Sequence, residues 1–161
     1  SRHSERDDKA DFSLTRPGPL PFGERSLCFW RLFMGLDIFF LGRDRVCVTD
    51  AVVSVPETRE VGYFRKVNPL IAWFEKHCGP IENAVERPVS RTELEALLSD
   101  LECLTPENCR EFFPTTEGFF FGSQEYDQYY WKDVEDVKSW VRRTLDSFDF
   151  ERKILLLWAW W

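Results

Sequence analysis

Apolar and polar positions along the chain divide it into segments with two different periods. Residues 35–42 are rich in Ile, Phe and Leu and predict a strand with at least one buried face. Residues 46–48 and 51–55 predict a second strand that Pro56 ends, and the two strands together predict a hairpin. Residues 154–161 are apolar on both faces, so we expect them to form a central strand of the sheet.

Three segments have the spacing of amphipathic helices, with apolar side chains recurring at intervals of three and four. They are residues 67–77, 91–103 and 128–146. Pro69 is tolerated in the first turn of the first helix, and Gly79 ends that helix. Ser90 and Glu93 match the capping box that begins many helices, so the second helix has the strongest local signal in the chain.

The remaining segments are shorter. Residues 83–89 predict an edge strand whose pairing Pro88 limits, and residues 106–117 predict a loop. Residues 118–123 place three Phe between two Gly and predict a short strand. Strands at both ends with helices between them predict an α+β fold, in which about three helices cover a mostly antiparallel sheet.

The chain contains one Met, Met34, directly before the first predicted strand. Residues 1–33 are charged at first and then rich in Pro and Gly, so we expect them to be an added or read-through extension, poorly ordered in part. On this interpretation residues 34–161 form a single α+β domain. The alternative is a native N-terminal arm that packs through Leu27, Phe29, Trp30, Leu32 and Phe33.

Composition narrows the class of protein. The 161 residues suit one domain, and no apolar run approaches the ~20 residues that a membrane helix needs. The net charge of −7 argues against non-specific binding to nucleic-acid phosphates, which requires a basic face. Five Cys without a paired C-x-x-C spacing indicate free thiols in a reducing compartment, so we expect a cytoplasmic protein.

The sequence contains no recognisable catalytic or metal-binding motif. It has no zinc spacing, no phosphate loop and no nucleophile elbow, and we expect no cofactor and no metal. His77 and Cys78 are adjacent on a predicted helix and so do not face each other. Two pairs of carboxylates are interpreted as solvated faces: Glu125 with Asp127, and Asp133 with Asp136. These observations favour a binding protein over an enzyme.

Two clusters nevertheless have ligand-binding chemistry. The first spans residues 62–68 and places aromatic rings, two cations and an amide at the start of a predicted helix. Free amides at a helix N-terminus and a neighbouring guanidinium suit an anion. Its candidate ligand-binding residues are Tyr63, Arg65, Lys66 and Asn68.

The second cluster spans residues 118–131, where a Gly-Ser pair allows close approach of a ligand and aromatic rings are available for stacking. Its candidate ligand-binding residues are Gly122, Ser123, Tyr126, Asp127 and Tyr129. The alternative is purely structural: the aromatic strand belongs to the core, and Arg65 pairs with Asp127 or Glu125.

The same segments resemble a family of short proteins encoded by bacteriophages and prophages. The resemblance covers residues 34–161 and rests on Met-Gly-Leu-Asp at 34–37, Gly-Tyr-Phe-Arg-Lys-Val-Asn at 62–68, Trp-Phe at 73–74, and Gly-Phe-Phe-Phe-Gly-Ser-Gln-Glu-Tyr-Asp at 118–127. Phe64 stands where the family usually has Trp, and Leu70-Ile71-Ala72 where it often has Ile-His-Asn. The tail at 157–161 is more apolar than is usual in the family.

The resemblance implies a phage setting, the cytoplasm of an infected bacterium, where small acidic accessory proteins often bind components of host defence. Combined with the two clusters, this gives a first hypothesis, a protein that sequesters a nucleotide-type signal, with Arg65 and Lys66 on phosphate, Tyr63, Tyr126 or Tyr129 stacked on the base, and Gly122-Ser123 donating hydrogen bonds. The alternative is an acidic inhibitor that occupies the basic channel of a host nuclease such as a CRISPR effector. An enzyme that degrades the signal is a third hypothesis. Trp158, Trp160 and Trp161 would suit the interface of a homo-oligomer.

Overall fold

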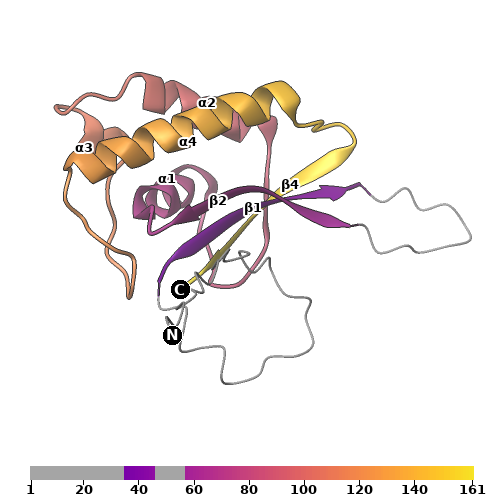
Figure 1. The fold of residues 1–161 in the computed structure, drawn as a ribbon, viewed down its shortest axis with the longest axis horizontal. Helices are drawn as coiled ribbons and strands as arrows, with labels where there is room; N and C mark the ends of the chain where they lie inside the picture. Colours follow the sequence, from indigo (N-terminus) through magenta and orange to yellow (C-terminus); the bar gives the residue numbers. More distant parts are fainter. Residues whose placement is uncertain (1–34, 46–56) are drawn as a thin grey trace, which may run out of the picture.

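The computed structural model describes residues 35–45 and 57–161, and these form an α+β fold. Four antiparallel strands lie in the order β2-β1-β4-β3, and the helices pack on one face of this sheet (Figure 1). The strands are β1 (Asp37–Asp44), β2 (Thr58–Arg65), β3 (Arg87–Val89) and β4 (Lys153–Trp160). The helices are α1 (Asn68–Cys78), α2 (Arg91–Glu102), α3 (Cys109–Phe112) and α4 (Gln128–Ser147). The predicted fold class is therefore confirmed.

The first and last described strands are the two central ones. β1 pairs with β4 along its whole length, from Asp37 opposite Trp160 to Asp44 opposite Lys153. Among the described strands, β3 lies at the edge and pairs with β4 alone, in accordance with the limit that Pro88 places on pairing. The prediction that the C-terminal strand is central is therefore confirmed.

The partner of β1 on its other side is β2, which the sequence pattern did not indicate. The predicted hairpin partner, 46–48 with 51–55, lies outside the described residues. Trp140 of α4 packs directly on the backbone of Gly62 in β2. A Cβ added to Gly62 would collide with the indole ring. The indole Nε1 donates to the carbonyl of Val61 at 2.9 Å, so this close approach fixes α4 on the sheet.

Local signals account for the helices. The Ser90 side chain accepts from the Glu93 amide at 3.1 Å and Glu93 accepts from the Ser90 amide at 3.2 Å, so the predicted capping box begins α2. Asp127 caps α4 by accepting from the amides of Tyr129 and Tyr130. The three predicted helices are confirmed to within a residue or two, and the additional short helix α3 lies inside the predicted loop.

One predicted strand is wrong. Residues 118–123 form a turn and an extended loop, because the Phe121 amide donates to the carbonyl of Gly118 at 3.1 Å. Phe120 and Gly122 have positive φ angles of 68° and 92°, which no strand accommodates. Phe121 packs inward against Trp161, with ring centroids 5.3 Å apart, whereas Phe119 points to solvent and is 78% exposed.

The core lies between the sheet and the helices. Its largest fully buried side chains come from β1, α1 and the residue after α3, and they are led by Phe40, Trp73, Phe74 and Phe113. A second, smaller apolar cluster lies on the opposite face of the sheet and consists of Phe39, Leu41 and Leu156, with Tyr63, Ile154 and Trp158 against it. None of the helices in the described part of the chain is long and apolar enough to cross a membrane.

The aromatic side chains at the end of β4 are partly buried within the chain itself. Trp161 packs on Phe121, and its backbone exchanges hydrogen bonds of 2.8 and 3.1 Å with the side chain of Asn83. Trp158 lies against the second cluster. The expected homo-oligomer stays a prediction.

Candidate functional site

Three of the four segments that carried the family resemblance, the ones around residues 36, 66 and 120, meet at one end of the sheet. The Lys66 amide donates to the carbonyl of Leu36 at 2.7 Å, and the Leu36 amide donates to the carbonyl of Phe120 at 3.1 Å. Gly122 lies against Lys66, since a Cβ added to Gly122 would be 3.0 Å from the Lys66 Cβ. The start of β1, the end of β2 and the loop before α4 therefore form one structural unit.

The side chain of Asn68 holds this unit together. It is 1% exposed, and its Nδ2 donates to the carbonyls of Phe121 and Ser123 at 3.2 and 3.0 Å. Its Oδ1 accepts from the Thr116 amide at 3.0 Å. Both donors of the amide are thus used within the protein, so Asn68 positions the site and has no free N–H for a ligand.

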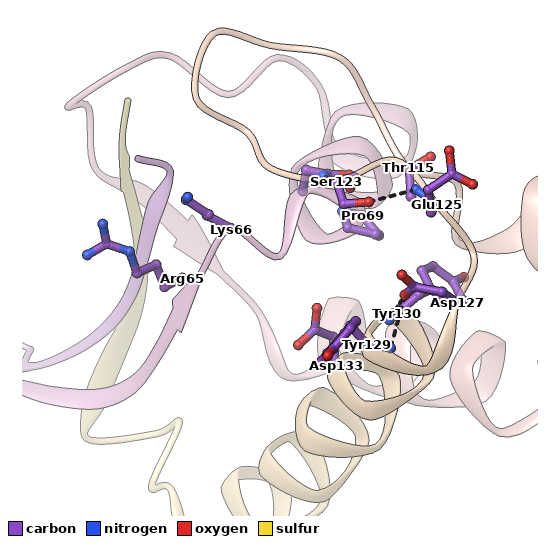
Figure 2. A pocket seen from close by; sticks show the side chains of 11 residues that line it. Arg65, Lys66, Pro69, Thr115, Ser123, Glu125, Asp127, Tyr129, Tyr130 and Asp133 are labelled. Atoms are coloured by element: carbon purple, nitrogen blue, oxygen red, sulfur yellow. Dashed lines mark hydrogen bonds between the residues drawn. The ribbon is translucent and has the colours of Figure 1, made fainter. Parts of the chain in front are cut away.

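A cavity of about 170 Å³ lies where β2, α1 and the N-terminus of α4 meet. Arg65 and Lys66 lie on one side of it, and Glu125, Asp127 and Asp133 lie on the other (Figure 2). The other lining residues are Asn68, Pro69, Thr115, Ser123, Tyr129 and Tyr130. The cavity therefore carries opposite charges on opposite walls.

The cationic wall is held loosely. The Arg65 guanidinium lies 3.9 Å from the carboxylate of Asp37, and its side chain is 43% exposed. Asp37 has a closer partner, the Tyr63 hydroxyl, which donates to it at 2.6 Å. The alternative that Arg65 pairs with Asp127 or Glu125 is not what the structure shows, since Asp37 is its nearest carboxylate partner among the described residues. Arg65 is therefore ion-paired with Asp37 and half-exposed, whereas Lys66 has no side-chain hydrogen bond or ion pair within the described residues.

The three carboxylates of the opposite wall differ in what they already bind. Asp127 Oδ1 accepts from two backbone amides of α4, at 3.0 and 3.1 Å, and serves as the helix cap. Glu125 is on the exposed loop before that cap. Asp133, in the second turn of α4, is partly buried and has no hydrogen bond or ion pair within the described residues. Asp133 is therefore a carboxylate of the cavity lining whose oxygens have no partner among the described residues.

Burial changes the acidity of that carboxyl group. Desolvation raises the pKa of Asp133, and the nearby charge of Asp136 raises it further. Burial also raises the pKa of the Tyr130 hydroxyl, which donates to the carbonyl of Phe113 at 2.7 Å and stays protonated. A partly desolvated carboxylate in a cavity opposite two cations is typical of a binding site.

Six of the nine ligand-binding residues predicted from the sequence line the cavity. They are Arg65, Lys66, Asn68, Ser123, Asp127 and Tyr129. The other three support the site from outside. Tyr63 bonds Asp37, Gly122 backs Lys66, and the Tyr126 hydroxyl accepts from the Thr115 amide at 3.0 Å.

The sequence interpretation missed five lining residues: Pro69, Thr115, Glu125, Tyr130 and Asp133. Asp133 was interpreted with Asp136 as a solvated helix face, yet it lines the cavity while Asp136 pairs with Lys132 at 2.6 Å. A local signal was present, because Asp127, Tyr130 and Asp133 are spaced by three and so lie along one helix face. Which way that face turns depends on the packing of α4.

The titratable side chains that line the cavity are two cations, three carboxylates and two Tyr. Neither His nor Cys lines the cavity, and among residues 35–45 and 57–161 no group of His, Cys, Asp and Glu is arranged to hold a metal ion. Burial raises the pKa of the Cys78 thiol, and Glu93 adds to that effect, so this thiol is a poor nucleophile at neutral pH. The arrangement is suited to holding a ligand of mixed polarity.

Replacing Asn68 with Ala tests its role in positioning the site. The change leaves two carbonyls and one amide without their partner, so we expect a loss of about 3 kcal/mol in the free energy of unfolding. Asn83→Ala is the matched control, because Asn83 also bonds two backbone groups but is exposed, and it should cost less than about 1 kcal/mol. Urea unfolding of both variants measures the difference, and equal losses would contradict the assignment.

Replacing Asp133 with Asn tests the desolvation of its carboxyl. Because the folded pKa is raised, the folded state holds this proton more tightly than the unfolded state, and stability from this group is lost as pH rises through its pKa. Asp133→Asn should therefore raise the melting temperature slightly at pH 7, and the gain should vanish toward acidic pH. Thermal unfolding of variant and wild type over a pH series measures this. A variant that melts below wild type at pH 7, and equal to it at acidic pH, would contradict the desolvation of Asp133.

Comparison with known proteins adds no family to this description. The chain matches no protein-family model, no curated protein and no solved structure. The interpretation of the cavity therefore depends on its own residues and their geometry.

Proposed function

We propose that this protein is a non-enzymatic binding protein that sequesters a small nucleotide-type ligand in the cavity between β2, α1 and α4. The observation that carries the proposal is that two cations lie on one wall of the cavity and that carboxylate oxygens without a partner lie on the other. In the setting that the family resemblance implies, the ligand is a host defence signal in the cytoplasm of an infected bacterium.

A nucleotide matches both walls. Its phosphate is an anion that a guanidinium and an ammonium bind by charge-assisted hydrogen bonds, which suits Arg65 and Lys66. Its base and sugar carry N–H and O–H donors that suit carboxylate oxygens. The ring of Tyr129 lines the cavity and is 67% exposed, so it is available for stacking on a flat base.

The size of the cavity limits how the ligand is held. Its 170 Å³ is below the roughly 300–1,000 Å³ of pockets that enclose a drug-sized molecule. The cavity therefore encloses one part of a nucleotide, and the rest lies along the exposed cations. On this proposal the ligand is retained and not converted.

Thermal unfolding against a panel of mono-, cyclic di- and cyclic trinucleotides tests the proposal. A ligand at about 100 times its dissociation constant adds about 2.7 kcal/mol, which raises the melting temperature by several degrees for a chain of this size. Arg65→Ala should abolish the shift. The matched control Arg143→Ala removes an exposed cation of α4 that does not line the cavity, and it should leave the shift intact.

Mass spectrometry of the ligand released on heating separates binding from turnover, since a sequestering protein returns the compound unchanged. No shift with any compound, or the same shift in Arg65→Ala as in Arg143→Ala, would contradict the proposal.

A second candidate, an inhibitor that binds a host protein, is favoured by one observation. Phe119 and Phe120 are 78% and 40% exposed, and their rings lie in edge-to-face contact with centroids 4.4 Å apart. The turn that presents them is anchored through Asn68 and Leu36, so little entropy is lost when a partner covers the rings. Pre-organised aromatic side chains are typical anchors of protein interfaces.

The double variant Phe119→Ser and Phe120→Asn tests this second function. Its melting temperature should stay unchanged or rise, because both rings are largely outside the core and Asn tolerates the positive φ of residue 120. Binding to a purified host nuclease should be lost in this variant and retained in Phe112→Ser, which removes a ring of similar exposure from α3. Equal binding by both variants would exclude the turn as the contact surface.

A further inference from the structure

The carboxylate of Asp133, which has no partner among the described residues, restricts which hydrogen-bond donors a ligand of the cavity must present. It is held on the second turn of α4, it lines the cavity, and the other fixed carboxylate, Asp127, already caps the helix. Figure 2 shows Asp133 on the side of the cavity facing Arg65 and Lys66. A ligand that reaches both walls must therefore present donors to Asp133 and an anion to the cations.

An ionised carboxylate accepts hydrogen bonds and donates none, and its two oxygens suit two neighbouring N–H groups. Guanine presents such a pair on its Watson–Crick edge, the N1–H and the 2-amino group. Hypoxanthine lacks the 2-amino group, adenine presents a donor beside an acceptor, and xanthine replaces the 2-amino group with a carbonyl. Each of these alternatives leaves an oxygen of Asp133 unpaired or facing a lone pair, which is unfavourable in a partly desolvated site.

We propose that Asp133 is the specificity-determining residue for a guanine base. The base enters the cavity with its N1–H and 2-amino group on the Asp133 carboxylate, and its phosphate lies on Arg65 and Lys66. This inference rests on the proposed function and names the class of nucleotide that the same cavity takes.

A simpler ligand with a single charge matches only one wall of the cavity. A lone ammonium group would pair with Asp133 but would leave Arg65 and Lys66 without a counterpart in the ligand. A lone phosphate would use the cations and be repelled by the carboxylates of the opposite wall, which has three of them. Only a molecule with donors at one end and an anion at the other satisfies both walls.

Isothermal titration with GMP, IMP, AMP and XMP tests the inference. A bidentate pair is worth about 1–3 kcal/mol of discrimination, so GMP should bind roughly 5- to 150-fold more tightly than AMP or XMP, with IMP between them.

The variant Asp133→Asn should exchange the preference for guanine for a preference for xanthine. An Asn amide offers one acceptor and one donor, which match the N1–H and the 2-carbonyl of xanthine. The variant should therefore lose most of its affinity for GMP and gain affinity for XMP. Asp136→Asn is the matched control, because Asp136 lies three residues further along α4, pairs with Lys132 and does not line the cavity. It should keep the order of affinities of the wild-type protein.

The outcomes separate this inference from the proposed function. If no nucleotide binds, the proposed function fails and this inference fails with it. If the four nucleotides bind with equal affinity, or if Asp133→Asn keeps the preference for GMP, the cavity is a nucleotide site but Asp133 does not select guanine. A switch from GMP to XMP in Asp133→Asn alone supports the assignment, and loss of all binding in Asp136→Asn as well would overturn it.

Discussion

The buried amide of Asn68 is the constraint on which the site depends. It satisfies two carbonyls and one amide from a loop some fifty residues later in the chain, and these three backbone groups have no other hydrogen bond within the described residues. Because Asn68 is the first residue of α1, its bonds tie the loop to the end of β2 and so bring the cations of residues 65 and 66 opposite the start of α4.

Electrostatics then distinguishes this cavity from a simple anion site. The N-terminus of α4 is already occupied by the Asp127 side chain, so its free amides are not offered to a phosphate. A phosphate would therefore be bound by Arg65 and Lys66 on the other wall. The remaining carboxylates can accept hydrogen bonds from donor groups of a ligand. The cavity lining therefore carries two kinds of charge, whereas the sequence analysis assigned cations for phosphate and rings for stacking but no carboxylate acceptor from α4 beyond its cap.

The sequence predicts the features whose signals are local and misses those that depend on contacts between distant segments. The capping box at Ser90 and the helical spacing of α4 are local, and both helices were predicted closely. β2 was missed because its pairing with β1 is set by contacts across the sheet. Residues 118–123 were predicted as a strand from three Phe between two Gly, whereas a bond from the Phe121 amide to the Gly118 carbonyl closes a turn there and Asn68, far away in the sequence, bonds the carbonyls that follow. The cavity's cations were found from residue type, whereas Asp133 depends on how α4 is rotated.

The most direct test of the central claim is an amide NMR titration of the protein with GMP. Binding in the cavity should shift the backbone amides of Lys66, Ser123 and Asp133 together, with one saturation curve, and should leave the second apolar cluster around Phe39 and Leu156 unchanged. Saturable shifts confined to that opposite face of the sheet, or no saturable shift at all, would contradict the assignment of the cavity as the ligand site.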